Sequence, residues 1–352
     1  MKSLVRKNIE EMAGYTPGEQ PREKKYIKLN TNENPYPPSP KITEFLKSFD
    51  PSLLRLYPDP VFSELRQKIA SLYHFNSENI IVGNGSDDIL TIAVRTFTDQ
   101  TKSLACFAPS YSLYPVLAKI QDCPCKEIML DVENGFSLPI NVEDKIKDAA
   151  LVIICRPNAP TGNCFPLDRV ESIIKSASGF VLIDEAYAEF ADDNAIPLVK
   201  KYNNVGVMRT LSKSYSLAGL RLGYLIAHEN IIENLMKVKD SYNVGMLAQK
   251  IAIEALSDQN HLLANIAKIR RDREFLIKSL RNMNFRVFDS QSNFVLAEPP
   301  GGKAKELYQK LKEAGILVRY FPAEITKKYV RITIGTHEEI EQLLDTIPKC
   351  LS

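Results

Sequence analysis

The chain has 352 residues, a length typical of one large domain or two unequal ones. Hydrophobic residues make up 44% and charged residues 25%, which excludes a disordered chain, a collagen-like repeat and a disulfide-stapled miniprotein. With 45 Lys and Arg against 43 Asp and Glu, the formal charge of +2 gives no reason to expect a nucleic acid or an anionic membrane as partner. No apolar run approaches the roughly eighteen residues that span a bilayer. The N-terminus also lacks a signal-peptide pattern, so a cytoplasmic enzyme is predicted.

Cysteine and histidine are too dispersed to indicate a metal site. The six cysteines lack both the CxxC pairs of a zinc site and the density of a secreted scaffold, and the four histidines are scattered. We therefore expect no metal and reduced, mostly packed cysteines.

The first 40 residues show little periodicity and several prolines, which predicts an extended arm lying over the body of the protein (Pro21, Pro35, Pro37, Pro38 and Pro40). Asp59-Pro60 is then predicted to start a helix, because apolar residues follow at helical spacing (Phe62, Leu65, Ile69, Leu72 and Tyr73). Short apolar runs separated by helical stretches come next, at 80–82, 103–107, 151–155, 180–183 and 205–208. This alternation predicts a mainly parallel sheet covered on both faces.

After about residue 245 the pattern changes to one long helical stretch running towards Leu280. Residues 329–334 then alternate as a strand, and Thr336 with Glu339 predicts a capping box for the closing helix. The predicted organisation is an arm at 1–40 that joins the small domain, a large domain at 41–245, and a connecting helix with a small α+β domain at 246–352. A ligand is expected at the carboxyl ends of the strands, in the cleft between the domains.

A first candidate motif is Gly83-Asn-Gly-Ser-Asp-Asp88, which follows an apolar strand and opens a helix. The free backbone amides of a helix N-terminus favour an anion such as a phosphate. Alone, the motif is more typical of a plain strand-to-helix turn capped by Ser86.

A second candidate is the apolar strand at 180–183, which ends in Asp184 and is followed by Tyr187. A carboxylate at a buried strand end requires a facing cation or strong donor. A helix cap is an even alternative for Asp184.

The third candidate covers residues 209–223, where Lys213 lies among hydroxyl residues and Arg221 follows eight residues later. A shielded amine near other cations loses its proton easily and becomes a nucleophile for a carbonyl. A solvated lysine in a serine-rich loop is the ordinary alternative.

Together the three segments suit one cofactor, pyridoxal 5'-phosphate. Lys213 would form a Schiff base with its aldehyde and Asp184 would keep its ring nitrogen protonated. The Gly85-Ser86-Asp87 turn and Arg221 would bind its phosphate.

Over nearly its whole length the sequence resembles the fold type I pyridoxal-phosphate-dependent aminotransferases, and among them the histidinol-phosphate aminotransferases. The resemblance is carried by LNTNENPYPPSP at 29–40, LYPDP at 56–60, GNGSDD, APSYSLYP, RPNAPTG, DEAYAEF, RTLSKSYSLAGLRLGY, KVKDSYNV, ILVRY and VRITIGT. It implies an α/β fold with a mainly parallel seven-stranded sheet covered by helices in the large domain, and a smaller α+β domain.

The resemblance also implies a role for each matching residue at the cofactor. Lys213 would carry the cofactor and move the proton, Asp184 would pair with the ring nitrogen, and Tyr187 would bind the ring oxygen O3′. Further cofactor contacts are implied for Tyr111 on the ring face and, around the phosphate, for Gly85, Ser86, Asp87, Thr210, Ser212, Arg221 and Tyr57. Tyr57 would reach the cofactor of the neighbouring subunit, which implies a homodimer.

On the substrate side, the resemblance implies that Arg331 binds the α-carboxylate and that Arg319 and Tyr15 help with the anionic end. A guanidinium fork suits both a carboxylate and a phosphate. Packed aromatic residues and surface arginines are the alternatives at these positions.

One position departs from the family. The residue before Pro160 is commonly an asparagine that donates to the ring oxygen, and here it is Ala159. Asn158 lies one residue earlier and points elsewhere in an extended segment. It is retained only as a candidate cofactor contact.

The predicted function is ping-pong transamination between glutamate and imidazole acetol phosphate, which yields 2-oxoglutarate and histidinol phosphate in histidine biosynthesis. Two alternatives keep the cofactor: a threonine-phosphate decarboxylase and an aminotransferase for aromatic amino acids. A remote third is a non-catalytic binding module.

Overall fold

The computed structural model describes residues 4–20 and 26–351; Pro21 of the predicted arm lies outside the described residues. The arm holds one short helix, α1 (Lys7–Glu10), and one short strand, β1 (Ile27–Lys28). Strand β1 pairs in parallel with β11 (Ile316–Leu317), which ties the arm to the C-terminal part of the chain. The next helix, α2 (Pro40–Ser48), begins with Ser39 as its cap.

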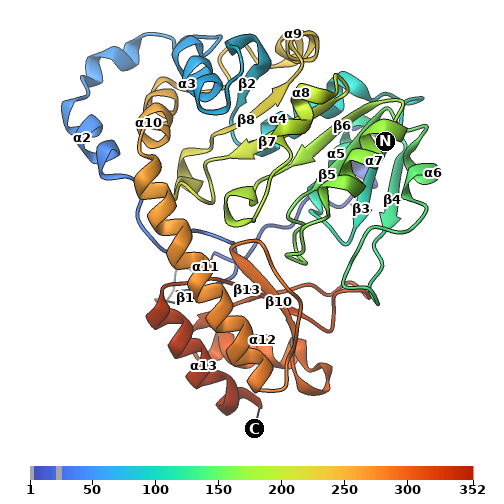
Figure 1. Ribbon diagram of the computed structural model, residues 1–352, viewed down its shortest axis with the longest axis vertical. Helices are drawn as coiled ribbons and strands as arrows, with labels where there is room; N and C mark the ends of the chain where they lie inside the picture. The colour runs from blue at the N-terminus through green and yellow to red at the C-terminus, as the bar shows by residue number, and fades with distance from the viewer. Residues whose placement is uncertain (1–3, 21–25, 352) are drawn as a thin grey trace.

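A seven-stranded sheet forms the centre of the larger part of the molecule (Figure 1). Its order is β2-β8-β7-β6-β5-β3-β4, and every neighbouring pair is parallel except those made by β8. The strands are β2 (Ile80–Gly83), β3 (Leu104–Ala108), β4 (Cys125–Met129), β5 (Leu151–Cys155), β6 (Phe180–Asp184), β7 (Val205–Thr210) and β8 (Gly223–Ala227). This confirms the predicted α/β class and the mainly parallel sheet. Strands β4 and β8 were not predicted.

Helices cover this sheet. As a result, every residue is buried in five of its strands, β2, β5, β6, β7 and β8. Helix α4 packs on β2, β7 and β8, whereas α5 packs on β3 and β4. The helices of this part are α3 (Ser63–Tyr73), α4 (Ser86–Phe97), α5 (Leu113–Gln121), α6 (Val142–Ile146), α7 (Leu167–Ser176), α8 (Ile196–Lys201) and α9 (Glu229–Val238). Short 3-10 turns lie at Pro51–Arg55, Ser77–Asn79, Ala188–Phe190, Ala218–Leu220 and Pro300–Gly302.

Helix α3 begins later than predicted. The side chain of Asp59 accepts hydrogen bonds from the backbone N–H groups of Val61 and Ser63, which closes a turn ahead of the helix. Phe62 is then left-handed, with φ of 57°, so the helix starts only at Ser63.

The predicted long helix is two helices, α10 (Met246–Leu256) and α11 (Gln259–Asn282). The break lies at Asp258, whose carboxylate accepts the backbone N–H of His261 and so caps α11. Figure 1 shows α11 running from the part that contains the seven-stranded sheet down to the smaller part of the molecule.

The smaller part contains a four-stranded antiparallel sheet in the order β12-β13-β10-β9. Its strands are β9 (Arg286–Val287), β10 (Phe294–Glu298), β12 (Arg319–Tyr320) and β13 (Val330–Thr333), with helices α12 (Ala304–Glu313) and α13 (His337–Leu351) beside them. The predicted capping box is present: Glu339 N–H donates to Thr336 Oγ1 at 3.3 Å, and Thr336 N–H donates to Glu339 Oε2 at 2.8 Å. The domain boundaries at 40/41 and 245/246 stay predictions.

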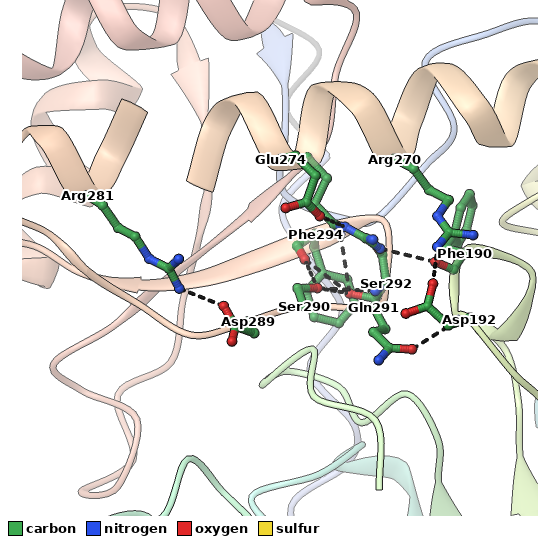
Figure 2. Close-up of polar contacts among 11 residues, drawn as sticks. Phe190, Asp192, Arg270, Glu274, Arg281, Asp289, Ser290, Gln291, Ser292 and Phe294 are labelled. Carbon is green, nitrogen blue, oxygen red and sulfur yellow. Dashed lines mark hydrogen bonds and ion pairs between the residues drawn. The ribbon is translucent and has the colours of Figure 1, made fainter. Parts of the chain in front are cut away.

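Polar side chains of α11 hold the loop between β9 and β10 against the loop after Phe190 (Figure 2). Arg281 donates to Asp289 at 2.6 Å, and Arg270 pairs with Asp192. The buried Arg273 donates to the backbone oxygens of Phe190 and Ser292, at 3.1 and 3.0 Å. These contacts fix the residues that precede β10, next to the site described below.

Two further predictions concern cysteines and membranes. All six cysteines are free, and no His, Cys, Asp or Glu cluster that could hold a metal is found among the described residues. No helix in the described part of the chain combines the length and apolar character needed to cross a membrane.

Candidate active site

A cavity of about 550 Å³ opens where the parallel strands end. Ala108, Cys155, Asp184 and Thr210, the last residues of β3, β5, β6 and β7, all line it. The predicted edge of the sheet therefore holds the cavity. Its lining includes most of the predicted site residues (Tyr15, Ser86, Asp87, Tyr111, Asp184, Tyr187, Thr210, Ser212, Lys213, Arg221, Arg319 and Arg331).

Asp184 is a buried carboxylate with neutral donors as partners. Tyr114 OH donates to Asp184 Oδ2 at 2.7 Å, and Ala186 N–H donates to Asp184 Oδ1 at 3.1 Å. Burial raises the pKa of Asp184 to about 6, although both hydrogen bonds oppose the shift. The carboxylate would become more stable if a cationic group in the cavity faced it.

Lys213 is half-buried, and its Nζ donates to the backbone oxygen of Thr31 at 3.2 Å. The amine lies 5.8 Å from the centre of the Tyr187 ring. Burial and the Arg331 guanidinium lower the pKa of Lys213 to about 8. A much larger fraction of this amine is therefore neutral near pH 7 than of an exposed lysine.

The turn between β2 and α4 forms a cradle for an anion. Gly85 has a φ of 84°, a conformation that favours glycine, and a Cβ added to it would lie 2.6 Å from Arg221 Nη2 and push the guanidinium aside. Arg221 donates to Asp87 Oδ2 and to Ser212 Oγ, each at 3.3 Å. Ser86 opens the twelve-residue helix α4, whose first N–H groups are suited to an anion.

Arg319 and Arg331 lie directly opposite each other in the pair formed by β12 and β13. Arg331 Nη2 donates to the backbone oxygen of Asn30 at 2.9 Å, but its buried Nε finds no hydrogen-bond partner among the described residues. Arg319 donates to the backbone oxygens of Thr16 and Pro17, at 3.3 and 3.2 Å. Neither guanidinium forms an ion pair with a carboxylate within the described ranges 4–20 and 26–351.

Two aromatic residues close the cavity on the side of the arm. Tyr15 meets Tyr111 edge to face, with ring centres 5.8 Å apart. Tyr111 OH donates to Asp87 Oδ1 at 3.2 Å, which fixes this ring beside the anion cradle.

The structure does not place Asn158 or Tyr57 at the cavity of this chain. Asn158 is fully buried and donates to the Pro109 backbone oxygen and to Thr161 Oγ1. The predicted contact of Asn158 with a cofactor therefore finds no support in the geometry. Tyr57 is 79% exposed and stacks on Tyr242, with ring centres 4.5 Å apart.

Sequence reasoning missed Tyr114 and the segment from Asn30 to Asn32. Tyr114 is the buried partner of Asp184, and only its place near the predicted Tyr111 hinted at it. The backbone oxygens of Asn30 and Thr31 accept hydrogen bonds from Arg331 and Lys213, and the Asn32 amide donates to Tyr187 OH at 2.9 Å. The segment lies within the quoted stretch 29–40, which had no residue assigned to the site.

Comparison with known proteins matches residues 24–347 to the family described as aminotransferase class I and II. The histidinol-phosphate aminotransferase of Rippkaea orientalis is 45% identical over 343 residues, 97% of each chain. That of Microcystis aeruginosa is 46% identical, also over 97% of each chain. The crystal structure of histidinol-phosphate aminotransferase from Sinorhizobium meliloti in complex with pyridoxal-5'-phosphate has the same fold. It superposes with a TM-score of 0.88 at 22% identity, over 100% of this chain and 98% of that one. The chain therefore belongs to the class I and II aminotransferase family, among the histidinol-phosphate aminotransferases.

Proposed function

We propose that this protein is a pyridoxal-phosphate-dependent aminotransferase that exchanges the amino group between glutamate and imidazole acetol phosphate, in histidine biosynthesis. The proposal rests on one cavity that brings together an amine with a lowered pKa, a buried carboxylate and an arginine for which the described residues supply no carboxylate partner. These are Lys213, Asp184 and Arg331. The names of the relatives that share 45 and 46% of its residues support the substrates.

The residues present fit pyridoxal phosphate. Its phosphate suits the cradle of Ser86, Ser212 and Arg221, where a glycine leaves the guanidinium room. Thr210 contributes by holding Ser212, since the two hydroxyls lie 3.0 Å apart. When bound, the cofactor supplies an aldehyde and a ring that withdraws electrons from the reacting carbon. Tyr111 offers an aromatic face for that ring.

Asp184 would pair with the ring nitrogen of bound pyridoxal phosphate and favour its protonated form. A protonated pyridine nitrogen is the cation that this buried carboxylate lacks among its neutral donors, Tyr114 and Ala186. Pairing with it would stabilise the carboxylate and so offset the desolvation that raises the pKa of Asp184.

Lys213 moves the proton of the reacting carbon. A general base works best when its pKa lies close to the working pH, and the pKa of about 8 meets that condition. The Thr31 backbone oxygen and the Tyr187 ring on either side of Nζ orient the amine.

Arg331 and Arg319 bind the anionic group of either substrate. Like charges directly opposite on paired strands repel each other, and an anion between them removes the repulsion. A planar guanidinium donates two parallel hydrogen bonds to a carboxylate or to a phosphate, so the same pair suits glutamate and histidinol phosphate. Tyr15, at the same end of the cavity, closes it beside Arg319.

The proposal includes a homodimer in the cytoplasm. Tyr57 lies in a stretch with several exposed apolar side chains, Leu53, Leu54, Leu56 and Val61. Such a patch supports burial against a second copy. Tyr57 would then reach the cofactor phosphate of the partner subunit.

Parallel assays separate this function from its rivals. The purified protein, supplied with pyridoxal phosphate, is given glutamate and imidazole acetol phosphate, glutamate and phenylpyruvate, or threonine phosphate alone. The proposal predicts that the first pair has the highest kcat/KM. Faster turnover of phenylpyruvate, or release of carbon dioxide from threonine phosphate, would replace it with an aromatic aminotransferase or a decarboxylase. If the protein binds the cofactor but turns over none of these substrates, the non-catalytic binding module would be the remaining alternative.

A further inference from the structure

Asn32 lies in a loop, yet it is buried, and both its backbone and its side chain form hydrogen bonds. It is 1% exposed and has a left-handed backbone with φ of 57°, a conformation that asparagine and glycine adopt most readily. Its backbone N–H donates to Thr333 Oγ1 at 3.0 Å, and its backbone oxygen accepts from Asn293 Nδ2, also at 3.0 Å. Thr333 of β13 and Asn293, in the loop just before β10, therefore hold this residue at the cavity.

The direction of the Asn32 amide follows from the same contacts. Thr333 Oγ1 already accepts the Asn32 N–H, so its own proton is free to go to Asn32 Oδ1, 3.1 Å away. With its oxygen occupied in this way, the side chain presents its NH₂ group to Tyr187 OH at 2.9 Å. Tyr187 accepts this bond, so its hydroxyl proton must be donated elsewhere.

The cavity offers the remaining direction for that proton. Tyr187 lines the cavity, and no acceptor for its hydroxyl proton is found among residues 4–20 and 26–351. The neighbouring position that could have supplied a second donor is Ala159, which has no polar side chain, and Asn158 is committed to Pro109 and Thr161. Tyr187 can therefore donate its hydroxyl proton to a ligand oxygen in the cavity.

We infer that Asn32 is a positioning residue that fixes the Tyr187 hydroxyl as a hydrogen-bond donor to the ring oxygen of the cofactor. The inference rests on the proposed function, because that function supplies the ring oxygen. Asn32 acts only through Tyr187. Its removal leaves the tyrosine free to rotate its hydroxyl proton away from the cavity.

The test is Asn32→Gly, because glycine keeps the left-handed backbone and both backbone hydrogen bonds while removing the amide. The matched control is Asn284→Gly, since Asn284 has a φ of 63° and lies exposed in the turn after α11. The affinity of the cofactor-free protein for pyridoxal phosphate is measured by fluorescence titration, in the natural chain and in Tyr187→Phe.

The expected result is about tenfold weaker cofactor binding for Asn32→Gly, the size of one lost hydrogen bond, and no change for Asn284→Gly. In Tyr187→Phe, the further change Asn32→Gly should alter affinity less than about twofold, because the hydroxyl is already absent. The pH at which the absorption of the bound cofactor changes should also rise, since a ring oxygen without its donor holds a nearby proton more tightly.

If Asn32→Gly lowers the cofactor affinity equally in the natural chain and in Tyr187→Phe, the inference is overturned, because Asn32 would then act through the backbone of the segment. Unchanged affinity would overturn it as well. If Asn32→Gly fails to fold, Asn32→Asp replaces it, since a carboxylate accepts the Tyr187 proton and should weaken cofactor binding in the same Tyr187-dependent way. Absence of pyridoxal phosphate binding by the natural chain would instead contradict the proposed function.

Discussion

Arg319 and Arg331 face each other across β12 and β13, yet neither forms an ion pair with a carboxylate of the described residues. Without substrate the arrangement costs stability, since the two cations repel and the part of the chain that the structure describes offers no acceptor to Arg331 Nε. Burial, together with the Arg319 cation, lowers the pKa of Arg331 to about 10. The pair is thus arranged for an anion that arrives with the substrate.

Replacing Arg331 should therefore weaken the binding of both substrates. We expect Arg331→Gln to lower kcat/KM for glutamate and for histidinol phosphate by about 10- to 100-fold each, the value of one or two charge-assisted hydrogen bonds. Steady-state kinetics with each substrate measures this. Arg286→Gln, which changes an exposed arginine on β9 of the same sheet, is the control and should have no effect. An unchanged KM for glutamate would show that the two substrates do not share Arg331.

Asp184 should destabilise the folded protein when no cofactor is bound. Its pKa rises from 3.8 to about 6 on folding, so the unfolded chain loses this proton first as the pH increases. Stability therefore falls between about pH 4 and pH 6, by roughly 3 kcal/mol. Asp184→Asn removes that cost but loses the bond from Ala186 N–H, so a net gain of about 2 kcal/mol is expected at pH 8.

Urea denaturation of the cofactor-free proteins at pH 8 and at pH 4 measures this difference. The gain should vanish at pH 4, because Asp184 is then protonated in the folded chain and only about half ionised in the unfolded chain, so little of the cost remains. The same variant should bind pyridoxal phosphate more weakly. Asp50→Asn is the control, because Asp50 is exposed, its pKa is lowered by hydrogen bonds from Ser52, and no gain is expected. A variant that is less stable than the natural chain at pH 8 would contradict the prediction.

The lowered pKa of Lys213 predicts how fast the cofactor reacts at each pH. Only the neutral amine attacks an aldehyde, so the rate of reaction of the cofactor-free protein with pyridoxal phosphate should rise with pH and level off above about 8. Stopped-flow absorbance measures this rate. Because the Arg331 cation contributes to the lowering, Arg331→Gln should move the midpoint upward. A midpoint near 10.5, the ordinary lysine value, would contradict the assignment.

A hybrid dimer tests whether Tyr57 acts across a subunit interface. Chains carrying Lys213→Ala and Tyr57→Ala are co-expressed with different tags, and the mixed dimer is isolated. If Tyr57 serves the partner's site, one of the two sites has both residues intact, and about half of the natural activity should appear. If Tyr57 serves its own chain, or if the protein is a monomer, the mixture should be no more active than the separate variants.

The sequence predicted most of the central sheet because buried parallel strands are continuous apolar runs, as in β5 and β6. Strand β4 was missed because it lies at the edge of the sheet and only Ile128 of its five residues is buried. The break at Asp258 was also missed, since a cap inside a periodic apolar stretch leaves the periodicity intact. Strand β8 was missed because its apolar residues follow directly after the motif at 209–223 and were not considered as a separate strand.

At the site, local patterns located Lys213, Asp184 and Arg221, because each lies at or shortly after the end of a strand or turn of recognisable type. Tyr114 and Asn32 could not be found in this way. Tyr114 looks like a packed aromatic residue of α5, and the contacts of Asn32 join residues about 150 to 300 positions apart. Such pairings depend on tertiary packing, which one sequence does not display.

The most direct test of the central claim is chemical trapping of the cofactor on the protein. The purified chain with pyridoxal phosphate is reduced with sodium borohydride, digested and analysed by mass spectrometry, with Lys213→Ala as the control. We expect one modified lysine, Lys213, no stable adduct in the variant, and loss of the adduct when glutamate is added before the reductant. A modified lysine elsewhere, or an adduct that persists in Lys213→Ala, would contradict it.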